Sequence, residues 1–276
     1  MIPFGERLRA AVDAHGPLCV GIDPHGALLR AWGLPDSAEG ARTLSLAVVD
    51  AAADRVAIVK PQVAFFERFG AAGVAVLEEV IVSARASGLL VIADAKRGDI
   101  GSTAEGYGAA WLAATAPLRS DAMTLSPYLG LDALDPAIAI GRAAGAGVFV
   151  LASTSNPEGS VVQGARDDDG TTVAALMTQE AARRNETAPA GEWGDIGVVI
   201  GATRPLADAG IDPGILARTP ILAPGFGAQG ARLGELHALF GSAAGTVIPS
   251  VSRSVLDAGA EGLVSAIESH RTELLR

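Results

Sequence analysis

The sequence predicts a (β/α)8 TIM barrel, an α/β fold formed as a single domain by residues 1–276. Eight short apolar runs recur along the chain, segments with helical spacing separate them, and 276 residues is a common length for one such barrel. An open, doubly wound parallel sheet is the alternative, because it is built from the same alternation. No linker or break in composition indicates a second domain.

The apolar runs are typical of parallel strands that are buried on both faces. Each is too short for a helix and too uniformly apolar for a sheet with one wet face. Since 49% of the residues are hydrophobic but only 4% are aromatic, the core must be mostly Ala, Val, Leu and Ile. The single cysteine, Cys19, is expected to be a small buried hydrophobic residue. The predicted strands are 18–23, 56–60, 89–94, 121–126, 147–153, 196–201, 220–225 and 245–250.

Alanine-rich segments with apolar residues at helical spacing connect these strands. The interval 203–218 has the weakest helical pattern, because Pro and Gly interrupt it. Two stretches, 156–171 and 185–195, look like loop insertions. The first follows the C-terminal end of a strand, so it is either a lid over an active site or a mobile solvated loop. The predicted helices are 40–54, 71–87, 102–116, 132–144, 172–185, 232–240 and 254–270.

Composition excludes several classes of function. A net charge of −10 argues against binding to nucleic acid or to an anionic membrane, although a local pocket for a small anion stays open. One cysteine cannot form an intrachain disulfide, and the four histidines show no metal-ligand spacing, so no metal site is expected. The start M-I-P-F-G-E-R-L-R-A lacks an apolar signal region, which predicts a soluble, cytoplasmic protein.

Charged residues end the first three predicted strands. Asp23 ends the first, Lys60 the second, and Asp94 with Lys96 the third, and these two lysines are the only ones in the chain. In a barrel these strand ends converge on one mouth. Asp94 and Lys96 should lie on the same side while the chain remains extended. The alternative is a salt-bridge network that only stabilises the rim.

A lysine held between carboxylates keeps its ammonium form, so it is a poor amine nucleophile. It is instead a fixed positive charge and a proton donor. This chemistry suits the stabilisation of a developing carbanion and its subsequent protonation.

A second motif is the glycine-rich stretch P-G-F-G-A-Q-G at 224–230, followed by P-S-V-S-R-S-V at 249–255. It contains a literal G-x-G-x-x-G, but the acidic residue that a dinucleotide site needs about 20 positions further on is missing. A phosphate site fits better, because barrels commonly bind phosphate with the loops after strands seven and eight. Arg253 adds a forked donor suited to phosphate oxygens.

These motifs together resemble the orotidine 5′-phosphate decarboxylase family. D-A-K-R-G-D-I (94–100) is similar to the D-x-K-x-x-D-I signature of that family, and the extra length and the 154–171 loop are similar to its longer bacterial branch. The resemblance implies a barrel without metal or organic cofactor that dimerises through its mouth. It also implies a carboxy-lyase that converts orotidine 5′-phosphate to UMP and CO2, the last step of de novo pyrimidine synthesis. Further matching segments are G-I-D-P (21–24), V-K-P (59–61), T-S-N-P-E-G (154–159), A-P-G-F-G-A-Q-G (223–230) and S-R-S-V (252–255).

The resemblance also implies a role for individual residues. Lys96 would protonate C6 of the pyrimidine within a charged array made with Lys60 and Asp94. The neighbouring subunit would complete this array with Asp99 and would line the site with Ile100 and Thr103. The arginine of the phosphate site usually follows a glycine in the family but follows a serine here. The remaining implied contacts are Asp23 and Lys60 to the ribose, Ser155 to the base, Gln229 and Arg253 to the phosphate, and Pro224, Gly225 and Ser252 as further substrate-binding residues.

Two rival functions stay open at this point. A magnesium-dependent hexulose-phosphate synthase or keto-gulonate-phosphate decarboxylase would share Asp94, Lys96 and Asp99, but would need a metal-binding acid where this sequence has Lys60-Pro61-Gln62. A barrel that only binds a nucleotide or sugar phosphate would need the glycine-rich loop and Arg253, but not charges at several other strand ends.

Overall fold

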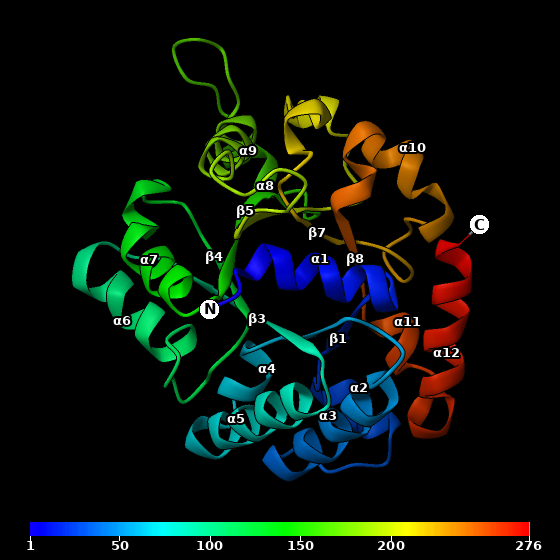
Figure 1. Cartoon of the computed structure of the whole chain (residues 1–276). Helices are drawn as coiled ribbons and strands as arrows, with labels where there is room; N and C mark the ends of the chain where they lie inside the picture. The colour runs from blue at the N-terminus through cyan, green and yellow to red at the C-terminus, as the bar shows by residue number, and fades with distance from the viewer. Residues whose placement is uncertain (276) are drawn as a thin grey trace.

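The computed structural model describes residues 1–275 and contains a closed barrel in which eight parallel strands pair in chain order, β1 to β8 (Figure 1). The predicted (β/α)8 class is therefore confirmed, and each predicted strand overlaps an observed one. The strands are β1 Cys19–Ile22, β2 Ile58–Pro61, β3 Leu90–Arg97, β4 Ala122–Leu125, β5 Gly147–Ser153, β6 Ile196–Ile200, β7 Ile221–Pro224 and β8 Val247–Val251.

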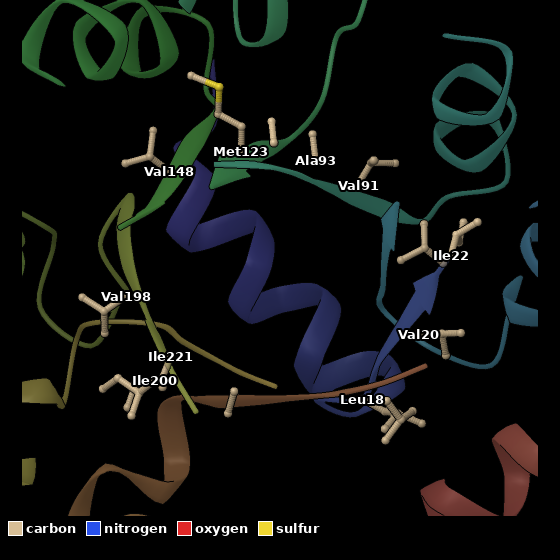
Figure 2. Close-up of a cluster of buried hydrophobic side chains, with 14 of the residues drawn as sticks. Leu18, Val20, Ile22, Val91, Ala93, Met123, Val148, Val198, Ile200 and Ile221 are labelled. Carbon is tan, nitrogen blue, oxygen red and sulfur yellow. The ribbon is translucent and has the colours of Figure 1, made fainter. Parts of the chain in front are cut away.

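The strands are apolar on both faces because the core has two layers. Successive side chains of a strand point to opposite faces. Val20, Val91 and Val198 belong to the layer between strands and helices, and Figure 2 shows such side chains pointing away from the barrel interior. Ile58 and Ile92 belong to a second layer inside the barrel. Continuing this alternation toward the C-terminal ends places Lys60 and Asp94 on the inner face.

The strands are surrounded by α3 Ala38–Ala52, α5 Gly70–Ala86, α6 Gly101–Trp111, α7 Asp135–Ala143, α9 Val173–Arg184, α10 Leu236–Phe240 and α12 Gly259–Leu274 (Figure 1). The interval 203–218 forms two short 3-10 helices, Ala207–Ala209 and Pro213–Leu216, since its prolines and glycines interrupt a longer helix. The predicted 254–270 helix is divided at Gly259, which has φ +70°. The short helices are α2 Gly26–Ala31, α4 Ala64–Glu67, α8 Gly159–Gln163 and α11 Arg253–Leu256. Within residues 1–275, no helix is both long and apolar enough to cross a membrane.

Helix α1, Phe4–His15, is not among the predicted elements, and it crosses the end of the barrel opposite the mouth (Figure 1). Phe4 is fully buried and meets Phe149 of β5 edge-on, with ring centroids 6.1 Å apart. Gly147 leaves room for this ring, because a Cβ there would lie 2.1 Å from Cδ1 of Phe4. Helix α1 therefore closes the barrel interior at the N-terminal ends of the strands.

Both predicted insertions are tied to the barrel through side chains. In the 156–171 stretch, Gln163 at the end of α8 accepts a hydrogen bond from the Thr154 backbone N–H at 3.0 Å and donates to Thr154 Oγ1 at 2.7 Å. In the 185–195 stretch, the buried Asn185 side chain bonds both backbone groups of Ile196. The role of 156–171 as a lid stays a prediction.

Candidate active site

A cavity of about 320 Å³ opens at the C-terminal end of the barrel strands. Every strand, or the residue that directly follows it, contributes to its wall, as expected for an active site of this fold. The lining residues are Asp23, Lys60, Gln62, Asp94, Lys96, Thr124, Leu151, Thr154, Ser155, Asn156, Val199, Leu222, Pro224, Gly225, Phe226, Ala228, Gln229, Ser250, Ser252 and Arg253.

Asp94 is the centre of a charged array at the ends of β2 and β3. Its Oδ2 accepts a hydrogen bond from Lys60 Nζ at 2.9 Å, and its Oδ1 accepts one from Lys96 Nζ at 2.5 Å. The Lys60 and Asp94 side chains are only 9% and 11% exposed, whereas Lys96 is 44% exposed. Lys60 is therefore a largely buried, fixed cation in the cavity wall, and Lys96 is the more exposed of the two cations.

The charges of this array stabilise one another. Burial alone would raise the pKa of Asp94, but the neighbouring Lys60 and Lys96 outweigh burial and hold that pKa well below its usual range. Burial alone would lower the pKa of Lys60, but the carboxylates of Asp94 and Asp23 raise it above its ordinary value. Asp94 is consequently a carboxylate, and Lys60 an ammonium, at neutral pH.

The backbone at Lys96 does not remain extended, so the prediction of a regular alternation from Asp94 to Lys96 is wrong. Lys96 has φ +48°, and the register of β3 with β4 shifts between Ala93 and Arg97. This left-handed conformation is uncommon for a residue with a side chain. The two side chains nevertheless meet, because the irregular backbone directs the Lys96 ammonium back to Asp94.

Asp23 meets Ser252 beside this array, because β1 pairs with β2 on one side and with β8 on the other. Ser252 donates from its hydroxyl to Oδ2 of Asp23, while Oδ1 of Asp23 is buried without a hydrogen-bond partner in the described structure. Gly21 makes this contact possible, because a Cβ there would lie 2.8 Å from Cβ of Ser252. The serine before Arg253 thus places a hydroxyl at the mouth, where it holds the Asp23 carboxylate.

The glycine-rich loop forms the third side of the cavity. Gly225, Gly227 and Gly230 all have positive φ, at +117°, +70° and +107°, which explains why glycine occupies each position. Gln229 of this loop accepts a hydrogen bond from Ser155 Oγ at 3.2 Å. With the exposed Arg253 alongside, the structure brings together the residues predicted to bind the base and the phosphate.

Three predicted site residues lie outside the cavity of their own chain. Asp99, Ile100 and Thr103 are not among its lining residues. Asp99 accepts a hydrogen bond from the backbone N–H of Ile100 at 2.8 Å, and Ile100 is 61% exposed. A single chain therefore does not assemble all the residues that the sequence predicts.

The sequence analysis assigned no role to several polar lining residues, notably Gln62, Thr124, Thr154 and Asn156. The Gln62 amide, with its nitrogen toward Asp94, donates to the Asp94 carbonyl oxygen at 2.8 Å and to Oδ2 at 3.2 Å. Strand alternation could have identified Thr124, since it is two residues beyond the inward-facing Ala122.

Comparison with known proteins connects this geometry to a family. A family model described as the orotidine 5′-phosphate decarboxylase / HUMPS family matches residues 16–267. Orotidine 5′-phosphate decarboxylase of Streptomyces coelicolor is 55% identical over 262 residues, which cover 94% of this chain and 91% of the relative. The enzyme of that name from Corynebacterium glutamicum is 48% identical over 265 residues, with 93% and 91% covered.

Solved structures agree with the sequence comparison. The crystal structure of a relative from Streptomyces avermitilis has a TM-score of 0.93 and 49% identity, and the match covers 100% of this chain and 97% of that one. Leishmania donovani OMP decarboxylase has a TM-score of 0.73 and 30% identity, with 98% and 100% covered. Since the family model, the sequences and the structures match along nearly the whole length, the chain belongs to the orotidine 5′-phosphate decarboxylase / HUMPS family.

Proposed function

We propose that this protein is a carboxy-lyase that converts orotidine 5′-phosphate to UMP and CO2, the last step of de novo pyrimidine synthesis. The relatives that cover more than nine-tenths of the chain carry the name of this activity. The observation that supports the chemistry is the Lys96 ammonium, which Asp94 holds at 2.5 Å in the mouth cavity.

The mechanism follows from the charge that the reaction creates. Loss of CO2 leaves an electron pair on C6 of the pyrimidine, with no electron sink in reach. The protein must then supply positive charge that is already in place, and the Lys96 ammonium supplies it. The electron pair takes a proton from Lys96 Nζ to form the C6–H bond of UMP, and Lys96 is left as a neutral amine.

Binding of the rest of the substrate is assigned to the other sides of the cavity. Asp23 and Lys60 hold the ribose hydroxyls, Ser155 holds the base, and Gln229 with Arg253 holds the phosphate. Pro224, Gly225 and Ser252 complete this wall. Contacts to the remote phosphate favour closure of the 154–171 loop, so that their binding energy contributes to the decarboxylation step.

A magnesium-dependent reaction fits the array less well. Both carboxylate oxygens of Asp94 already accept hydrogen bonds, from Lys60, Lys96 and Thr124. The buried Lys60 ammonium would also repel a divalent cation placed beside Asp94. Among residues 1–275, no cluster of three or more His, Cys, Asp or Glu side chains could hold a metal ion.

Turnover without metal tests the proposed function. Purified protein incubated with orotidine 5′-phosphate in EDTA should convert it to UMP at the same rate as in added Mg²⁺, which the pyrimidine ultraviolet absorbance reports. A folded protein that binds UMP but leaves the substrate unchanged would overturn the decarboxylase assignment. Activity that EDTA removes and Mg²⁺ restores would favour the magnesium enzymes instead.

We further propose a homodimer in which each subunit completes the site of the other. The residues that the cavity lacks, Asp99, Ile100 and Thr103, all follow β3 on the mouth side of the barrel. Large apolar side chains are exposed there, since Ile100 is 61%, Leu129 54% and Tyr128 80% exposed. An exposed apolar patch around a functional mouth is typical of an interaction surface.

Subunit mixing tests the shared site. Lys96→Ala and Asp99→Ala dimers should each be nearly inactive, whereas a hybrid dimer contains one site in which both residues are intact. After complete exchange at equal concentrations, about a quarter of the wild-type activity should return. Mixing Lys96→Ala with the Lys96→Ala/Asp99→Ala double variant creates no intact site and is the control. No recovery after demonstrated exchange would contradict sharing.

A further inference from the structure

The position of the Lys96 ammonium depends on two anchors. Lysine has a long, flexible side chain, and that of Lys96 is 44% exposed, so packing alone does not hold it. One anchor is the left-handed backbone at Lys96, with φ +48°. The other is the Asp94 carboxylate, which accepts a hydrogen bond from the Lys96 ammonium. A group that controls both anchors therefore controls where the proton donor lies.

Thr124 contacts both anchors with one hydroxyl. Its Oγ1 accepts a hydrogen bond from the backbone N–H of Lys96 at 2.9 Å and donates to Asp94 Oδ1 at 3.0 Å. Thr124 lies in the middle of β4, is 1% exposed, and faces into the cavity wall. A hydroxyl has one donor and two acceptor positions, so a single oxygen can serve both contacts at the same time.

We infer that Thr124 is a positioning residue for the decarboxylation, an inference that rests on the proposed function. Its hydroxyl stabilises the disfavoured backbone conformation of Lys96 and orients the oxygen of Asp94 that receives Lys96 Nζ. Without it, the Lys96 N–H loses its partner and the peptide is free to leave the left-handed region. The ammonium then samples other positions, so that its positive charge lies beside C6 for a smaller fraction of the time.

Substitution of Thr124 separates this role from a general contribution to packing. Valine has nearly the same shape as threonine but no hydroxyl, and serine keeps the hydroxyl. In Thr124→Val, kcat for orotidine 5′-phosphate should fall about 10- to 100-fold while the dissociation constant for UMP stays within about twofold. Thr124→Ser should keep kcat within about threefold of wild type. Where the valine variant does not purify folded, Thr124→Ala removes the same hydroxyl.

Thr178 provides the matched control. It is a buried threonine of α9 whose hydroxyl donates to the Ala175 carbonyl oxygen at 2.7 Å, far along the chain from the site residues. Thr178→Val should lose thermal stability but keep the wild-type kcat. A wild-type kcat in Thr124→Val, or a Thr124→Ser variant as slow as Thr124→Val, would overturn the inference. Absence of decarboxylation in the wild-type protein would instead reject the proposed function, so the two failures are distinguishable.

Discussion

Replacement of Lys96 by alanine is expected to lower kcat for decarboxylation by about 10³-fold or more while UMP still binds measurably. The reason is that the variant loses both the positive charge beside C6 and the proton that C6 must receive. Lys60 cannot take over these roles, because it is only 9% exposed and is bound to the other oxygen of Asp94 at 2.9 Å. Single-turnover rates and calorimetric titration with UMP measure the two effects separately.

Lys96→Arg distinguishes the charge from the proton. Arginine keeps the positive charge near Asp94, but its guanidinium does not give up a proton in proteins. This variant should bind UMP as wild type does and remain nearly as slow as Lys96→Ala. A Lys96→Ala protein that retains a substantial part of the wild-type kcat would show that another group protonates C6.

The second large effect is expected on stability, in Asp94→Asn. The substitution leaves the Lys60 ammonium buried without its main counter-ion. Breaking a buried ion pair by removing one partner typically costs about 3–5 kcal/mol. The free energy of unfolding at pH 7, obtained from denaturant titration, should fall by about this amount. Decarboxylation should also be lost, since Asn does not hold the Lys96 ammonium as a carboxylate does.

The direction of the pKa shift of Asp94 predicts how this difference varies with pH. Its folded-state pKa lies below the ordinary value of 3.8, so the unfolded state binds more protons as the pH falls through that value. The stability that Asp94 contributes is therefore complete above about pH 5 and decreases at lower pH. The difference between wild type and Asp94→Asn should shrink by about 1 kcal/mol between pH 7 and pH 3.

The raised pKa of Lys60 predicts that its contribution to stability has the opposite pH dependence and is lost at alkaline pH. In the wild type its pKa is raised above 10.5, so its stabilising contribution is present below that pH and decreases as the pH rises through the raised value.

Asp50→Asn is the control for the stability measurements on Asp94→Asn, because Asp50 is exposed on α3 and has no ion pair within the described residues. A stability difference that is independent of pH would contradict the ion pairing of Asp94.

Much of the fold and part of the site could be predicted from the chain alone. The eight buried strands were visible because a doubly covered strand must be apolar on both faces, whatever its neighbours are. Lys60 and Asp94 stood out because each interrupts such a run at its C-terminal end, where a barrel holds its active site. The 225–230 loop could also be recognised, because the positive φ values of its glycines favour this residue type whatever the distant contacts are.

Tertiary structure decided what depends on the relative position of distant segments. Helix α1 closes the barrel because Phe4 fits over Gly147 and beside Phe149. Thr124 meets Asp94 although 30 residues separate them in the chain, because the pairing of Ile92 with Ala122 and of Ala93 with Met123 brings the next residues of β3 and β4 side by side. A sequence pattern specifies which face of a strand is buried. It does not specify strand register or a left-handed residue in a strand, because these result from the summed contacts of the assembled barrel.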